Sequence, residues 1–133
     1  MTLLEAIQNR HSVRQYTDQK NEGEVLLQLN RTIEECNQES GLNIQLCLDL
    51  SKVFQSRMAC YGKFKNVRNY LALAGKYNKS LDEKCGYYGE KIVLRATQLG
   101  LNTCWVGFQY RKQNFVSLKP GEKLLLIIAN RLR

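Results

Sequence analysis

The sequence has 133 residues, of which 44% are hydrophobic and 24% are charged. A chain of this size can build one hydrophobic core but not two, and its composition excludes a disordered or collagen-like protein. Twenty Lys and Arg residues against twelve Asp and Glu give a net charge of +8. This excess attracts anions such as phosphates, cofactors or nucleic acid without choosing among them.

The sequence also bears on the compartment. Its longest apolar run, residues 124–129, is too short to cross a bilayer, and the N-terminal residues are too interrupted by charge for a secretory signal. We therefore expect a cytoplasmic protein that does not bind membranes. No two of the five cysteines form a CxxC pair, so we expect reduced thiols in and around the core. With one histidine in the chain, structural zinc is not expected.

The N-terminal third predicts two helices. Thr2 and Glu5 have the spacing of a capping box, which opens a short helix that ends near Arg10. The apolar face of this helix would be Leu3, Leu4 and Ile7. Residues 11–23 are polar and without periodicity, which predicts a loop. A second helix is predicted from Glu24 to about Asn37, and Gly41 ends it.

The middle of the chain predicts two strands. Polar and apolar residues alternate over residues 43–50, as in a half-buried strand, and the apolar run 70–74 suits a central strand. Between them, residues 51–67 are basic and mixed, which favours a loop with a short helical turn. Ser80 and Glu83 have the spacing of a second capping box, and we expect them to open the next helix.

That helix has the clearest pattern in the chain. An apolar stripe recurs along it at helical spacing: Leu81, Cys85, Tyr88, Ile92, Ala96 and Leu99. Gly100 is expected to end the helix. A strand or extended segment is predicted over residues 102–107, residues 111–116 are ambiguous, and residues 122–129 read as a buried strand. The order ααββαβ(α)β indicates the α+β class, and we expect a single domain over residues 1–133.

Three segments are candidates for chemistry. Residues 10–14, Arg-His-Ser-Val-Arg, form a compact set of hydrogen-bond donors for a phosphate. On an extended chain, one side would carry Arg10, Ser12 and Arg14, and the other side His11. The alternative is a solvated basic loop. In residues 99–107, Trp105 could wall a flat ligand that Gly107 lets the backbone approach, or it could be a core aromatic. In residues 84–89, two helical glycines suggest close packing, most simply against another helix.

Other chemistries have weaker signals. Residues 61–68 interleave bases and aromatics, as a nucleic-acid surface does, but they match no known reader motif, and a solvated loop is the simpler interpretation. Nothing in the sequence links a cysteine nucleophile to His11, and the chain has no Gly-rich phosphate loop of known type. We therefore assign no catalytic side chain.

Taken together, the segments resemble the FMN-dependent nitroreductase family. The first helix, AIQNR, runs directly into RHSVRQY, and the segment YGKFKNVRNYLALAG precedes the helix and strand EKCGYYGEKIVLRATQLGLNTCWVG. The opening resembles the family hallmark AIxxRxSxRxF/Y, and LGL followed by a tryptophan is similar to the segment that lies along the flavin. The resemblance covers residues 3–129 and implies an α/β sandwich with a central, mainly antiparallel sheet flanked by helices.

The resemblance also implies site residues. Arg10, His11 and Ser12 match the positions that hold the FMN phosphate and ribityl chain, and Arg14 matches the basic residue near the pyrimidine edge of the ring. A cation there favours the anionic reduced flavin. The family segment whose backbone faces flavin N5 is matched here by Trp105, Val106 and Gly107.

The activity implied is hydride transfer from NAD(P)H, through flavin N5, to a nitro compound, quinone or similar small acceptor. The family usually forms homodimers with the flavin at the interface, so a homodimer is expected. One alternative is a vestigial or truncated protein with this fold that binds flavin weakly and does not turn over. A small basic nucleic-acid-binding domain is the third interpretation, and salt-sensitive binding would reveal it.

Overall fold

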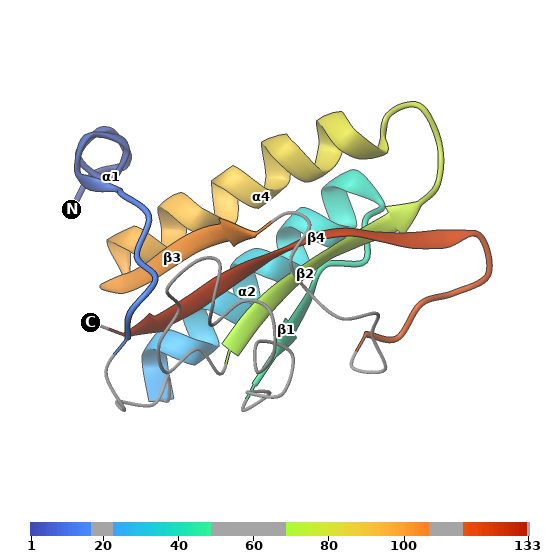
Figure 1. The fold of residues 1–133 in the computed structure, drawn as a ribbon. Coiled ribbons are helices and arrows are strands. Elements are labelled where there is room, and N and C mark those ends of the chain that lie inside the picture. Colours follow the sequence, from blue (N-terminus) through green and yellow to red (C-terminus); the bar gives the residue numbers. More distant parts are fainter. Residues whose placement is uncertain (17–22, 49–68, 107–115, 133) are drawn as a thin grey trace.

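The computed structural model describes residues 1–16, 23–48, 69–106 and 116–132, and all structural statements below concern these residues. In chain order they form two helices, two strands, a long helix and two further strands (Figure 1). The helices are α1 (Leu3–Asn9), α2 (Gly23–Ser40) and α4 (Leu81–Gln98), and the strands are β1 (Gln45–Cys47), β2 (Asn69–Lys76), β3 (Leu101–Val106) and β4 (Glu122–Leu132).

The strands form one sheet in the order β1-β2-β4-β3, and each neighbouring pair is antiparallel. The predicted central strand is confirmed, since β2 pairs with both β1 and β4. One bulge between Leu73 and Ala74 interrupts the β2–β4 register. The chain therefore has the expected α+β class, with a mainly antiparallel sheet flanked by helices.

The sheet separates two hydrophobic clusters. Helices α2 and α4 lie along one face, which we call the helix face (Figure 1). Because side chains alternate along a strand, neighbours in sequence serve opposite faces: Leu71 and Leu73 join the helix cluster, whereas Tyr70 and Ala72 join the other. On the opposite face the cluster consists of Tyr16, Cys47, Tyr70, Ala72, Cys104, Val106, Ile127 and Ala129.

The helix ends test the predicted caps. At α1 the capping box is confirmed in both directions: Glu5 N donates to Thr2 Oγ1 at 3.1 Å, and Thr2 N donates to Glu5 Oε2 at 2.7 Å. The second predicted box is wrong. Ser80 has helical backbone angles and makes no side-chain cap; its hydroxyl donates instead to Asn78 Oδ1 at 2.8 Å. The Ser80 hydroxyl therefore bonds the Asn78 side chain instead of the backbone N–H of the helix that the spacing predicted.

Glycines end two helices as expected. Gly41 follows α2 and Gly100 follows α4, with φ of 78° and 83°, a region that favours glycine. The glycines inside α4 differ from each other. A Cβ at Gly89 would lie 2.6 Å from Trp105 Cη2 and 2.9 Å from Leu73 Cδ1, whereas one at Gly86 would meet nothing within 4 Å. Close packing is thus confirmed at Gly89, against the sheet and not against another helix, and is wrong at Gly86.

Some predictions lie outside the described residues: the loop at 51–67, most of 111–116, Cys60 and the basic segment 61–68. The predicted strand over 43–50 is described as far as residue 48, and β1 is the part of it that pairs as a strand. The four described cysteines are free and buried (Cys36, Cys47, Cys85 and Cys104). None of the described helices is long and apolar enough to span a membrane.

Candidate functional site

The candidate site begins where α1 ends. Arg10 caps this helix with extended backbone angles, φ −64° and ψ 133°, so the chain leaves the helix as an extended segment. Val13 N donates to Thr103 O at 3.0 Å, and Ser12 forms a parallel bridge with Thr103. The segment thus lies along the outer edge of β3, which fixes its backbone against the sheet.

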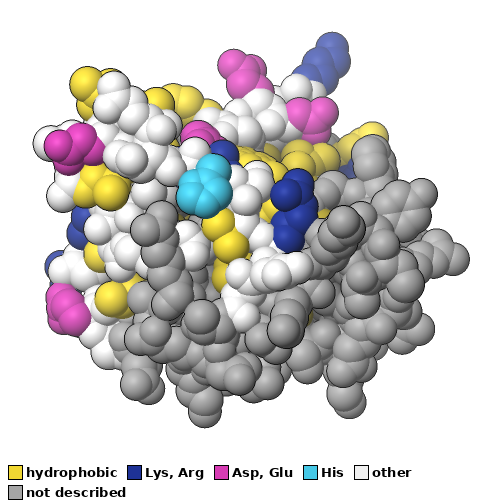
Figure 2. All heavy atoms as spheres, turned by 60° about the vertical axis from the view of Figure 1, so that its left-hand side comes forward, with side chains coloured by type: hydrophobic (Ala, Val, Ile, Leu, Met, Phe, Trp, Pro, Cys, Tyr) yellow, Lys and Arg dark blue, Asp and Glu magenta, His cyan; other side chains and the backbone are white. Residues whose placement is uncertain are grey.

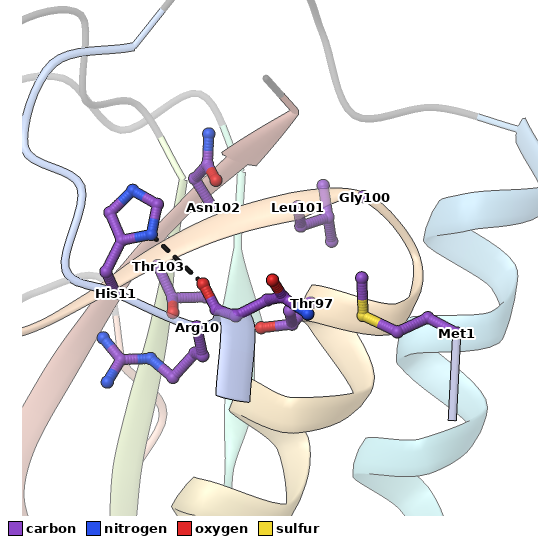
Figure 3. Close-up of a pocket in the computed structure, with 9 residues that line it drawn as sticks. Met1, Arg10, His11, Thr97, Gly100, Leu101, Asn102 and Thr103 are labelled. Atoms are coloured by element: carbon purple, nitrogen blue, oxygen red, sulfur yellow. Dashed lines mark hydrogen bonds between the residues drawn. The ribbon is translucent and has the colours of Figure 1, made fainter. Parts of the chain in front are cut away.

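The side chains of this segment diverge as the sequence predicts. Arg10 Nη2 donates to Ser12 Oγ at 3.2 Å, so these two residues share a side. His11 turns the other way, with its Nδ1 3.2 Å from Asn9 O (Figure 3). His11, Ser12 and Arg14 are exposed, whereas Arg10 is half-buried. The structure therefore places Arg10 and Ser12 together and separates His11 from them.

The segment carries two cations, Arg10 and Arg14, that have no carboxylate neighbour among the described residues. Among the described residues, one ion pair joins Lys91 of α4 to Glu39 of α2. Neither Arg10 nor Arg14 has a carboxylate oxygen of the described residues within 4.0 Å. Burial raises the pKa of Tyr16, while the charges of Arg14 and Arg10 act in the opposite direction, which places both guanidiniums within electrostatic reach of its hydroxyl. An anion near this segment would therefore meet two guanidinium groups.

A small cavity of about 100 Å³ lies beside the segment, where α1, the C-terminal end of α4 and the start of β3 meet. It is lined by Met1, Asn9, Arg10, His11, Thr97, Gly100, Leu101, Asn102 and Thr103 (Figure 3). Figure 2 shows this face of the molecule, with the imidazole of His11, the only histidine, exposed upon it. Sites for drug-sized ligands have roughly 300–1,000 Å³, so this cavity is the size of a phosphoryl group and not of a whole flavin.

Two of the residues here escaped sequence reasoning. Thr103 is 1% exposed, and its Oγ1 has no hydrogen-bond partner among the described residues; the same holds for the buried Nε of Arg10. Tyr16 also lies here, donating from its hydroxyl to Val13 O. Tyr16 belongs to the motif RHSVRQY and could have been found there. Thr103 lies within the candidate segment 99–107, but the sequence gives it no role, because only strand pairing brings it to the residues after α1.

The second predicted segment is partly described. The Trp105 side chain packs under α4 against Gly89, and its Nε1 donates to Glu90 Oε2 at 3.0 Å. These contacts are those of a core aromatic, one of the two roles considered for Trp105, and the ring is not among the groups that line the cavity. Val106 is buried on the opposite face of the sheet, and Gly107 lies outside the described residues. The predicted flavin contact through the backbone of residues 105–107 stays a prediction.

The chain is similar to known nitroreductases. A family model described as "Putative TM nitroreductase" matches residues 2–130. No protein of curated function matches the chain.

Solved structures show the same fold. A nitroreductase family protein from Clostridium difficile 630 superposes with a TM-score of 0.74 at 18% identity, over 99% of this chain and 84% of the other. An FMN-dependent nitroreductase from Clostridium difficile R20291 gives 0.72 at 18% identity, over 97% and 86%. A "putative nitroreductase in complex with FMN" from Desulfovibrio desulfuricans gives 0.73 at 17% identity, over 96% and 84%.

Proposed function

Because this chain belongs to the nitroreductase family, we propose that it is an FMN-dependent oxidoreductase whose reductant is NAD(P)H. The similar structures include one named as FMN-dependent and one in complex with FMN, which supports the choice of cofactor. When bound, FMN supplies two-electron redox chemistry, by which a hydride from NAD(P)H reaches a nitro compound, quinone or similar small acceptor.

The observation that carries this proposal is the cationic segment after α1. Arg10 and Arg14 have no carboxylate neighbour within 4.0 Å in the described chain, and Arg10 keeps a buried Nε–H without a partner. A phosphoryl group needs such donors, and the cavity beside them has a matching size. The residues therefore fit the phosphate end of FMN, with Arg10 as the main donor at the cavity and Ser12, which accepts from Arg10 Nη2, beside it.

The other site residues are assigned to the ribityl chain and the ring of FMN. His11 faces away from Arg10 and is exposed, so we assign it to the ribityl side of the phosphate. Arg14 would favour negative charge on the pyrimidine edge of the ring, and the backbone of Trp105, Val106 and Gly107 would line its N5 side. No side chain has to act as a nucleophile.

A homodimer is part of the proposal. Helix α1 buries only Ala6, and its apolar face is turned to solvent: Leu3, Leu4 and Ile7 are 53%, 64% and 54% exposed. An apolar helix face beside a binding site is typical of a protein interface. A second copy of the chain would cover it. Size-exclusion chromatography with light scattering would check this, with Leu4→Glu expected to yield monomers.

We place the protein in the cytoplasm and treat residues 1–133 as one functional domain. Its four described cysteines are free thiols, the state that a reducing compartment maintains.

The proposal is tested by a visible absorption spectrum of the purified protein, before and after loading with FMN and gel filtration. A retained band at about 450 nm with a shifted shape is expected. Oxidation of NADH and NADPH in the presence of nitroaromatics and quinones then identifies the substrates. A protein that stays colourless after loading would instead be a vestigial member of the family.

A further inference from the structure

Two buried polar atoms at the cavity are left without partners. Arg10 Nε and Thr103 Oγ1 have no hydrogen bond among the described residues, and both residues line the cavity (Figure 3). Native proteins pair nearly all buried polar atoms, because each unpaired one retains a desolvation penalty. Two such atoms, on two adjacent segments whose residues line one cavity, therefore point to a hydrogen-bond partner that the described residues do not supply in this arrangement.

The two atoms are complementary. An arginine Nε–H can only donate, and a threonine hydroxyl can accept. Their backbones are already held together, since Val13 N donates to Thr103 O at 3.0 Å and Ser12 forms a bridge with Thr103. The hydroxyl is thus fixed to the sheet, while the half-buried arginine has long side-chain torsions through which it can adjust.

The outer end of Arg10 is loosely held among the described residues. Its Nη2 makes a bond of 3.2 Å to Ser12 Oγ, which is long for a hydrogen bond, and no carboxylate of the described residues lies within 4.0 Å of the guanidinium. A guanidinium recognises a phosphoryl group through a planar fork, so the orientation of that plane decides how many bonds form. A partner on the inner side of the plane would set this orientation.

We propose that Thr103 positions Arg10 for a phosphoryl ligand: its buried hydroxyl accepts the Nε–H of Arg10 when the outer nitrogens bind the anion. Thr103 itself does not touch the ligand. The inference rests on the proposed function, because the phosphoryl group is taken to be that of FMN. It adds a residue that neither the motif RHSVRQY nor the chain order could supply.

The test compares three variants with the wild type. Thr103→Val removes the hydroxyl and keeps the shape, and Thr103→Ser restores the hydroxyl. Thr97→Val is the matched control, because Thr97 lines the same cavity but its hydroxyl already donates to Val93 O at 3.0 Å within α4. For each protein, dissociation constants are measured for FMN and for riboflavin, which lacks the phosphate, together with the melting temperature without ligand.

We expect Thr103→Val to bind FMN about five- to tenfold more weakly, as for the net loss of one ordinary hydrogen bond. Its affinity for riboflavin and its melting temperature should not fall, because the removed hydroxyl has no hydrogen-bond partner among the described residues. Thr103→Ser and Thr97→Val should resemble the wild type. Unchanged FMN binding in Thr103→Val, or an equal loss for FMN and riboflavin, would overturn the inference.

Failure of the proposed function is recognised separately. If the wild type binds neither flavin, inorganic phosphate becomes the probe: a rise in melting temperature that is smaller in Thr103→Val supports the inference, and an equal or absent rise overturns it. If Thr103→Val does not fold, Thr103→Ala replaces it. Arg10→Lys, which has no Nε–H, should then lose no further FMN affinity when Thr103→Ala is added, and additive losses would refute the role.

Discussion

The helix face of the sheet and the segment after α1 are built on different principles. On the helix face, Leu71, Leu73 and Ile128 are fully buried against α2 and α4. At the segment, Arg10 and Thr103 keep buried polar atoms without partners, and two arginines have no carboxylate neighbour in the described chain. Apolar side chains complete their contacts within the chain, whereas a buried polar atom without a partner gains its hydrogen bond only from a group outside the described residues, such as a ligand. The first region should therefore respond to mutation in stability, and the second in binding.

The largest effect is expected in the core of the helix face. Leu73→Ala removes a side chain that is 0% exposed, and we expect the free energy of unfolding to fall by about 2–5 kcal/mol. Leu27→Ala, at a position 53% exposed, should change it by no more than about 0.5 kcal/mol. Urea denaturation measures both. Similar losses in the two variants would contradict the division between core and surface.

The two glycines of α4 sharpen the same comparison within one helix. Gly89→Ala places a Cβ against the Trp105 ring, and we expect a loss of about 1–3 kcal/mol from overpacking. Gly86→Ala meets open space and should gain about 0.5–1 kcal/mol through helix propensity. Thermal denaturation of the pair is the measurement, and equal signs would show that the contact between α4 and β3 is not as tight as the structure has it.

The segment after α1 should behave in the opposite way. Arg10→Ala should weaken FMN binding about tenfold, since a charge-assisted bond to the phosphate is lost, while the free energy of unfolding changes by less than about 1 kcal/mol. Fluorescence titration gives the affinity. Lys119→Ala, at an exposed cation before β4, is the control and should leave binding unchanged. If both variants lose the same affinity, general attraction by net charge explains the binding.

The smallest expected effect is a pH dependence from the helix face. Burial raises the pKa of the Cys85 thiol to about 11, so the folded state keeps its proton after the unfolded chain has lost it near pH 9. Stability is then complete below pH 9 and is lost as the pH rises toward 11, with this thiol contributing about 1 kcal/mol at pH 10. Cys85→Ala should show a shallower decline between pH 8 and pH 10 in urea denaturation. An identical decline would remove the thiol as its cause.

Local patterns predicted most of the fold. The capping box at Thr2, the stop at Gly100 and the apolar run of β2 are properties of neighbouring residues, and the structure confirms all three. The failures come from competition that a pattern does not contain. Ser80 had the spacing of a cap, but Asn78 takes its hydroxyl. The apolar face predicted for α1 is present as Leu3, Leu4 and Ile7, but no described residue buries it.

The sequence by itself determined the α+β class, the family resemblance and the cationic segment of residues 10–14, because each depends on the order of residues along the chain. Only the tertiary structure decided which face Trp105 serves and that Thr103 lies beside Arg10. Both residues sit on β3: pairing with the segment after α1 brings Thr103 to Ser12, and packing of α4 on the sheet brings Trp105 to Gly89. Register is set by the pairing of whole strands, and no local pattern at residue 103 or 105 carries that information.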